Sequence, residues 1–285
     1  AYILSTILVK PLARVTKAIE DLTDGYQQDE ICVPDYTETE LITDAFNKML
    51  ARMKVLDESR SEFVSNVSHE LKTPMTSMKV LADSLVGQHG VPEDLYQEFM
   101  RDITAEIDRE NRIITDLLTL VKMDKKNADL QIQHMSINQL LEDILKRLRP
   151  IADKRNIDLI LDSFRPVEAD VDELKFTSAI SNLVENAIKY NVDDGWVRVS
   201  LDADHKFFYV TVADSGMGIP EDSLSRIFER FYRVDKSHSR EIGGTGLGLA
   251  ITRSTIGMHH GVIKVFSKEG EGTTFSVRVP LSYIP

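Results

Sequence analysis

A short run of residues around His69 combines the groups that covalent catalysis by a histidine requires. It reads Ser68-His69-Glu70-Leu71-Lys72-Thr73-Pro74. The carboxylate of Glu70 can accept a hydrogen bond from one ring nitrogen of His69, which leaves the other nitrogen as a nucleophile. Thr73 lies four residues after His69 and shares its helix face, so that its hydroxyl can position a water. A histidine on a helix is most often a plain solvated residue, and these neighbours favour the chemical role.

The phase of His69 on its helix supports the same interpretation. Phe63, Val67 and Leu71 continue an apolar seam through this segment. At about 100° per residue, the seam near Val67 and Leu71 averages about 20° beyond Val67, and His69 lies about 200° from Val67. The imidazole is therefore expected about 180° from the seam, on the outer face, where a bulky donor can reach it.

A second group of polar residues falls on a helix in the C-terminal half. Asn182, Asn186 and Lys189 recur at steps of four and three, which places them on neighbouring turns of one face. Amide oxygens can ligate Mg²⁺, and the lysine ammonium neutralises phosphate charge. Taken alone, the asparagines could equally be helix caps or satisfied core amides.

Two glycine-containing segments complete the candidate chemistry. Asp214-Ser215-Gly216-Met217-Gly218-Ile219-Pro220 follows a strand-like run. Its carboxylate can accept a hydrogen bond from an exocyclic amine such as that of adenine, and its glycines permit close backbone approach. Gly243-Gly244-Thr245-Gly246-Leu247-Gly248 opens a helix, whose amides and dipole favour phosphate. Each segment alone could be an ordinary turn, and the P-loop pattern Gly-x4-Gly-Lys-Ser/Thr is absent from the sequence.

Composition limits the classes of partner and compartment. The chain has 285 residues, of which 42% are hydrophobic and 28% charged, and this suits a protein of two or more compact units. The formal net charge of -12 disfavours direct nucleic-acid binding. Cys32 is the single cysteine, which fits a reducing compartment. His259-His260 has no cysteine or carboxylate cluster beside it and is expected to be structural.

Helical periodicity dominates the N-terminal half. Residues 1–9 (AYILSTILV) are almost all apolar but too few to span a bilayer, and Lys10 and Arg14 follow as positive flanks. We interpret them as the end of a transmembrane helix, the alternative being the start of a buried helix. An amphipathic helix is expected from Pro11, an irregular connector over Gly25–Tyr36, and a long heptad-like helix from near Glu38 to Leu85. A loop over residues 87–92 and a helix from about Glu93 to Asp124 complete an antiparallel hairpin, which is expected to dimerise into a four-helix bundle.

After residue 127 the pattern becomes mixed. Helices are expected at about Asn138–Asp153, Asp172–Tyr190 and Leu247–Met258, and this mixture predicts an α/β sandwich with helices on one face of a mixed sheet. The strand-like runs are Leu130–Ile137, Ile157–Leu161, Val197–Leu201, Phe207–Val212, Val262–Ser267 and Thr274–Val279.

These segments together resemble the sensor histidine kinases of two-component systems. The heptapeptide around His69 resembles the family's H box, and the two helices before it, with Pro11, Glu38 and Ala45-Phe46-Asn47, resemble a HAMP signal-relay module. The expected fold is thus multidomain, α and α+β. Its parts are a transmembrane stub (1–9), a HAMP coiled coil (10–61), the dimerisation and phosphotransfer hairpin (62–126) and an ATP-binding sandwich (130–285). The N, G1, F, G2 and final Gly-Thr boxes of the Bergerat-type ATP fold, shared with Hsp90, gyrase and MutL, are matched by Asn182–Tyr190, Asp214–Pro220, Phe228–Arg233, Gly243–Gly248 and Gly270–Phe275.

The resemblance implies a role for each matched residue. His69 is the phosphoacceptor, Glu70 orients it or takes its proton, and Thr73 belongs to the phosphatase motif. Asn186 holds Mg²⁺, Asn182 supports the triphosphate, and residues Val234–Ile242 form a lid. The remaining nucleotide contacts are Lys189 and Arg233 on phosphates, Tyr190 near the base, Asp214 on the adenine amine, and Gly216, Gly218, Tyr232, Gly244, Thr245, Gly246, Leu247, Gly248 and Thr273.

The predicted function is autophosphorylation of His69 by ATP with Mg²⁺, followed by transfer to an aspartate of a response regulator, with phosphatase activity toward that regulator. The protein is expected to be a homodimer on the cytoplasmic side of a bacterial cell membrane, with no nucleic-acid partner. One alternative is an ATPase of the gyrase, Hsp90 and histidine-kinase superfamily that drives conformational change, and such proteins lack an H box. A second is a non-catalytic nucleotide-binding scaffold, against which the intact His69, Asn186 and Asp214 argue.

Overall fold

The computed structural model describes residues 13, 15–17, 37–87, 92–123, 130–234 and 244–284. It divides into two compact units, Ala1–Lys72 and Thr73–Pro285. The predicted transmembrane stub, the connector Gly25–Tyr36, Cys32 and all of the predicted lid but Val234 lie outside the described residues. Of the predicted first HAMP helix, Ala13 and residues 15–17 are described, and all four are helical.

One long helix, α2 (Thr37–Val86), carries His69 and crosses the boundary between the units. Its bounds agree with the helix predicted from near Glu38 to Leu85. The seam residues Phe63, Val67 and Leu71 are half-buried, and Pro74 is buried, whereas most residues between them are exposed. These steps of four, four and three give one less exposed stripe over residues 63–74 of the helix.

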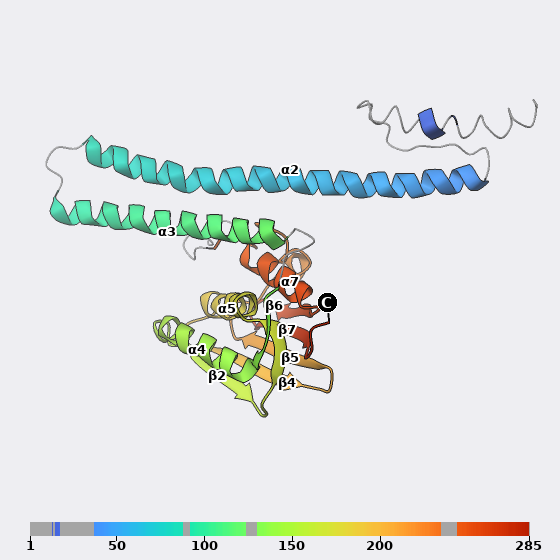
Figure 1. The fold of residues 1–285 in the computed structure, drawn as a ribbon. Helices are drawn as coiled ribbons and strands as arrows, with labels where there is room; N and C mark the ends of the chain where they lie inside the picture. Colours follow the sequence, from blue (N-terminus) through green and yellow to red (C-terminus); the bar gives the residue numbers. More distant parts are fainter. Residues whose placement is uncertain are drawn as a thin grey trace, which may run out of the picture. The chain divides into compact units, whose positions relative to one another are not determined.

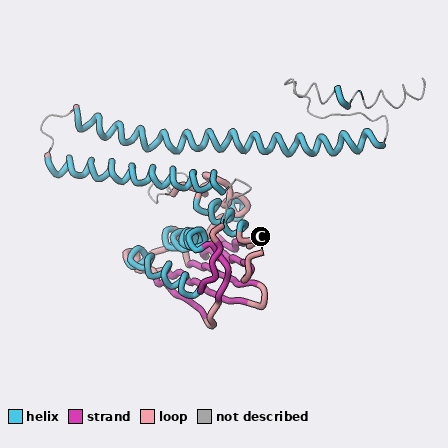
Figure 2. The backbone as a smooth tube through the Cα atoms, viewed as in Figure 1, coloured by secondary structure: helices cyan, strands magenta, loops and turns pink. Residues whose placement is uncertain are grey.

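Helix α3 (Glu93–Met123) follows and belongs to the second unit. Acidic Glu93 and Asp94 stand in its first turn and Lys122 in its last, as the helix dipole favours. With residues 73–86 of α2 it forms the predicted hairpin (Figures 1 and 2). Among the helices within the described ranges, none has the length and hydropathy that a bilayer span requires.

The rest of the second unit is an α/β sandwich. Its main sheet has the order β2-β4-β5-β7-β6, in which β2 and β4 are parallel and the other neighbours antiparallel. The prediction of a mixed sheet is therefore confirmed. Helices α4, α5 and α7 pack on this sheet (Figure 1). The bounds are α4 Ile137–Asp153, α5 Glu173–Lys189, α7 Gly248–Met258, β2 Asp158–Ser163, β4 Trp196–Ala203, β5 Phe207–Asp214, β6 Val262–Lys268 and β7 Gly272–Pro280.

A second, two-stranded sheet was only half predicted. Strand β1 (Ile132–Ser136) pairs antiparallel with β3 (Glu168–Asp172), and no run was predicted over β3. The sequence of β3, EADVD, has too many acidic residues to indicate a strand. The carboxylate of Asp172 then caps α5 by accepting a hydrogen bond from the Lys175 amide at 3.0 Å.

Alternating burial along the central strands builds the core. Every second residue of β4 and β5 is buried, including Val199, Leu201, Phe208 and Val210. Against them packs the apolar face of α5, where the Phe176 and Phe208 rings meet edge to face at 5.6 Å. The opposite side of α5 is left for Asn182, Asn186 and Lys189, which are all half-buried.

Candidate active site

His69 is exposed on α2, as its helical phase predicts, and Glu70 beside it is half-buried. Thr73, one turn later, is also exposed. The helix thus presents His69 and Thr73 to solvent while Leu71 and Pro74 turn inward. An exposed imidazole is accessible to a phosphoryl donor that approaches from outside the chain.

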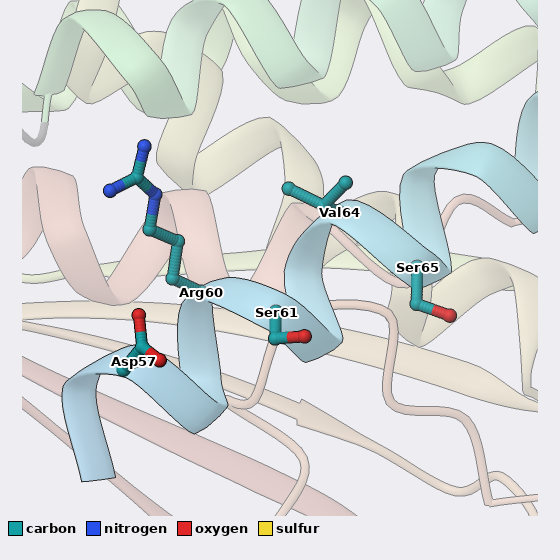
Figure 3. A pocket seen from close by; sticks show the side chains of 5 residues that line it. All are labelled: Asp57, Arg60, Ser61, Val64 and Ser65. Atoms are coloured by element: carbon teal, nitrogen blue, oxygen red, sulfur yellow. The ribbon is translucent and has the colours of Figure 1, made fainter. Parts of the chain in front are cut away.

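An open hollow of about 490 Å³ lies on the same helix before His69. Its lining residues are Asp57, Arg60, Ser61, Val64 and Ser65, shown in Figure 3. None of these five was a candidate site residue, and the hollow holds no nucleophile other than two serine hydroxyls. We therefore assign no chemistry to it.

The polar face of α5 lies against the glycine-rich segment that opens α7. The side-chain amide of Asn182 donates a hydrogen bond to the Gly248 carbonyl at 3.5 Å. A Cβ at Gly244 would lie 3.0 Å from the Lys189 ammonium and 3.6 Å from the Tyr190 hydroxyl. Two segments separated by more than fifty residues thus meet as the sequence predicts, with the lysine closest to the glycine-rich backbone.

Lys189 is held in a strongly cationic setting. Its pKa falls from 10.5 to about 8, first because burial disfavours the charged form, and then because Arg233 and Arg112 add positive charge nearby. Cations gathered in this way repel one another, and a polyanion would relieve that repulsion. The setting therefore fits the phosphate-binding role implied for Lys189 and Arg233.

Asp214, at the end of β5, is buried and uses one carboxylate oxygen to organise the backbone around it. Its Oδ1 accepts hydrogen bonds from the Gly216 amide at 2.8 Å and the Thr273 amide at 3.2 Å. Burial raises the pKa of this carboxyl to about 6. Both bonds reach Oδ1, so Oδ2 keeps its lone pairs for a ligand, as recognition of an adenine amine would require.

Two glycines allow the loops of the site to pack against other backbone. Gly218 has a φ of 70°, and a Cβ there would collide with the Lys268 carbonyl. Gly246 has a φ of 68°, and a Cβ would lie 2.9 Å from the Phe231 backbone. The Phe231 amide donates to the Gly246 carbonyl at 2.9 Å, which joins the predicted F and G2 boxes.

Three of the candidates, Tyr232, Thr273 and Leu247, have contacts with other residues of the protein. The Tyr232 hydroxyl donates to Ser223 at 3.0 Å, and the Arg226 guanidinium lies over its ring at 4.4 Å. Thr273 contributes its backbone amide to Asp214, while its hydroxyl pairs with that of Ser267 at 2.9 Å. Leu247 is fully buried at the N-cap position of α7, so its side chain packs in the core rather than facing a ligand.

Two residues that organise the site, Ser267 and Asp116, were missed from the sequence. Ser267 accepts a hydrogen bond from the Ile219 amide and donates to the Gly272 carbonyl, both at 2.8 Å, which ties two predicted boxes together. Asp116 of α3 accepts a hydrogen bond from Thr245 at 2.9 Å. Neither belongs to a recognisable spacing pattern, and only their distant partners reveal them.

The buried His259 illustrates a structural histidine. Its Nε2 accepts from the Asp172 amide at 2.9 Å, and its Nδ1 donates to the Thr255 carbonyl at 2.8 Å. Burial lowers the pKa of His259, which keeps it neutral. His260 stacks on Tyr283 with ring centroids 5.2 Å apart. Both histidines therefore serve packing.

Two regions of the chain match known protein families. Residues 59–126, which include His69, match the family described as the His Kinase A (phospho-acceptor) domain. Residues 171–283 match the histidine kinase-, DNA gyrase B- and HSP90-like ATPases. Over 228 residues the chain is 35% identical to the sensor histidine kinase WalK of Bacillus subtilis, covering 79% of this chain and 37% of WalK. The chain belongs to the sensor histidine kinases.

This histidine kinase spans 37% to 58% of the length of three curated relatives that it matches. Neither family match includes residues 10–58, so the HAMP module stays a prediction.

Two solved histidine kinases share its fold. Histidine kinase ThkA, in complex with response regulator protein TrrA, has a TM-score of 0.65 at 24% identity, over 87% of this chain and 68% of that one. Full-length ShkA, in complex with AMPPNP, has a TM-score of 0.59 at 23% identity, over 78% and 46%. The helical hairpin followed by an α/β sandwich is therefore the fold of this family.

Proposed function

We propose that this protein transfers the γ-phosphoryl group of ATP to His69 and then to an aspartate of a response regulator. The observation that carries the proposal is the presence, in one chain, of an exposed His69 in a phospho-acceptor domain and of a buried Asp214 and cationic Lys189 in an ATPase domain. A nucleophile and a nucleotide site are both required for this reaction.

In the proposed reaction a ring nitrogen of His69 attacks the γ-phosphorus of ATP. An N–P bond forms, the bond between the γ-phosphorus and the bridging oxygen breaks, and ADP leaves. Glu70 accepts a hydrogen bond from the other ring nitrogen and takes the proton that the imidazole loses. Lys189 offsets negative charge on the phosphates.

The residues around Asp214 and Lys189 fit ATP in chemistry. Oδ2 of Asp214 accepts from the adenine amine, while Lys189, Arg233 and the glycine-rich segment Gly244–Gly248 bind the phosphates. Tyr190 lines the base side. Asn182 supports the triphosphate, and Asn186 is the proposed Mg²⁺ ligand. Magnesium would neutralise phosphate charge, and it commonly takes one or two protein ligands beside phosphates and water. The further proposed contacts are Gly216, Gly218, Tyr232 and Thr273.

We propose that the protein works as a homodimer with a receiver-domain partner. Helices α2 and α3 leave Met75, Val80, Ile114 and Leu118 exposed in the single chain, as a hairpin that pairs into a four-helix bundle would. The ThkA–TrrA complex, whose kinase has the same fold, supports a response regulator as the partner.

We further propose attachment to the inner face of a bacterial cell membrane. Support comes from the apolar residues 1–9 and from Lys10 and Arg14 behind them, which follow the positive-inside rule.

Incubation of the full chain with radiolabelled ATP tests the proposal. A label on the protein that acid removes and base preserves is expected, because a phosphoramidate is acid-labile. ATP hydrolysis without protein labelling would overturn it in favour of the conformational ATPase. Nucleotide binding with neither hydrolysis nor labelling would favour the scaffold.

Replacement of Thr73 by alanine is expected to separate two activities. The hydroxyl positions a water for attack on the phosphorylated regulator, and loss of such positioning costs about 100-fold in rate. Autophosphorylation should persist, since His69 and Glu70 remain. The measurement is the dephosphorylation rate of a labelled regulator, compared with the labelling rate of His69. Thr104→Ala is the matched control, because Thr104 hydrogen-bonds to its own helix at the Met100 carbonyl. Equal loss of both activities in Thr73→Ala would contradict this role.

A further inference from the structure

The C-terminal part of α3 packs on the glycine-rich segment within the unit Thr73–Pro285. Asp116 Oδ2 accepts a hydrogen bond from the Thr245 hydroxyl at 2.9 Å, and Thr245 Oγ1 in turn accepts from the Leu247 amide at 3.2 Å. Below this polar contact, Leu120 packs with Leu247 and Ile251 in a small buried cluster, which Leu117, Met123 and Phe231 border. The helix and the loop are thus joined by one polar and one apolar contact.

The contact at Asp116 fixes where the preceding turns of α3 lie. Arg112 lies four residues before Asp116, and Arg109 seven residues before it, so both share the helix face of Asp116. At 1.5 Å per residue they stand about 6 and about 10 Å further along the axis. Arg109 is only 25% exposed and lies 3.8 Å from Glu106 of its own helix.

Both arginines add positive charge near the Lys189 ammonium. Arg112 and Arg109, like Arg233, lower the pKa of Lys189, whereas Glu185 raises it. The Lys189 ammonium itself lies beside Gly244, one residue before Thr245. Lys189 of α5, Arg109 and Arg112 of α3 and Arg233 therefore add their positive charges in this part of the site. Glu185 and Asp116 offset part of this positive charge. A di- or triphosphate supplies several further negative charges at once.

We propose that Arg112, assisted by Arg109, binds the nucleotide phosphates from α3, and that the Asp116–Thr245 hydrogen bond positions α3 to do so. The inference rests on the proposed function and extends it, because the nucleotide site then includes the helical hairpin as well as the ATPase domain. By linkage, bound ATP also strengthens the docking of α3 on the glycine-rich segment.

Calorimetric titration of the full chain tests this inference with Mg-ATP and, separately, with adenosine. Arg112→Gln is expected to weaken Mg-ATP binding about five- to tenfold, the effect of one partly screened charge. Adenosine affinity should not change, because it carries no phosphate. Arg101→Gln is the matched control, since Arg101 lies on the same face of α3 but about 16 Å further away, and it should bind both ligands like the parent chain.

A double-mutant comparison tests the role of Asp116 as a positioning residue. Asp116→Ala should also weaken Mg-ATP binding, and adding Arg112→Gln to it should cause no further loss, because α3 no longer docks. A full additional loss would show that Asp116 does not position Arg112.

Two results would overturn the main inference. Unchanged Mg-ATP affinity in Arg112→Gln is one, and an equal loss for adenosine is the other. If the unmodified chain fails to bind Mg-ATP, the proposed function itself is wrong. Failure of the proposed function can therefore be distinguished from failure of the proposed role of Arg112. Thermal unfolding of each variant checks that it is folded.

Discussion

Replacement of His69 by glutamine is expected to lower acid-labile labelling of the protein by more than about 1,000-fold, because it removes the nucleophile itself. Glutamine keeps the polarity and helix compatibility of the position but has no nucleophilic nitrogen. His69 is exposed on α2, so the free energy of unfolding should change little. The measurement is protein-bound label after incubation with radiolabelled ATP.

His205→Gln is the matched control for this substitution. His205 is also exposed, but it lies between β4 and β5, outside the proposed site. It should be labelled like the parent chain, and both variants should bind Mg-ATP with parent affinity. Substantial acid-labile label on His69→Gln would place the phosphoryl group on another residue and reject His69 as the acceptor.

Replacement of Asp214 by asparagine is expected to abolish nucleotide binding while making the protein more stable. The amide oxygen can still accept from the Gly216 and Thr273 amides. The amide nitrogen then takes the place of Oδ2 and points a donor at the adenine amine, which is itself a donor. A charged hydrogen bond is lost and two donors are opposed, so the affinity for Mg-ATP should fall at least about 100-fold.

The gain in stability follows from the raised pKa of Asp214. The folded protein holds this carboxyl at a pKa of about 6, against an ordinary value of 3.8, so folding favours the protonated form. That contribution is fully present below pH 3.8 and is lost as the pH rises through 6. At pH 7 the ionised carboxylate therefore costs up to about 3 kcal/mol, and asparagine removes this cost.

Chemical denaturation between pH 4 and pH 8 measures the difference between Asp214→Asn and the parent chain. The advantage of the variant should grow from pH 4 to pH 6 and then level off. Asp204→Asn is the matched control, because hydrogen bonds from Tyr209 and from the Lys206 and Phe207 amides lower the pKa of Asp204 to about 2. Its loss should not stabilise the fold, and Mg-ATP affinity should remain unchanged. If the Asp214→Asn variant were less stable than the parent chain at pH 7, Asp214 would not be a functional carboxylate that lowers the stability of the fold.

Some of the features behind these two predictions could be predicted from the sequence, and others could not. The outward phase of His69 was predictable, because a helix repeats every 3.6 residues and the neighbouring seam residues Val67 and Leu71 mark the inner face. The same local rule predicted α2 and α3 to within a few residues. Strands β4, β5 and β7 were predicted from apolar alternation, which is likewise a short-range property.

Where a segment depends on a distant partner, the sequence was a weaker guide. Strand β3 was missed because its acidic residues disfavour a strand, and it forms by pairing with β1 through Ala169 and Val171, which are buried. The parallel pairing of β2 with β4 was not specified either. Both pairings join segments more than thirty residues apart, and no local spacing encodes them.

The nucleotide site also combines features that the sequence predicts with features that only the tertiary structure shows. Sequence alone predicted that Asp214, Lys189 and the glycine-rich segment form one site, because the order and type of their motifs resemble one family. Only the tertiary structure decided that Oδ1 of Asp214 is occupied by two amides and that Asp116 of α3 holds Thr245. A motif specifies chemical groups along the chain, whereas hydrogen-bond partners depend on how distant elements pack. Those contacts arise only when the sheet, α5 and α3 come together.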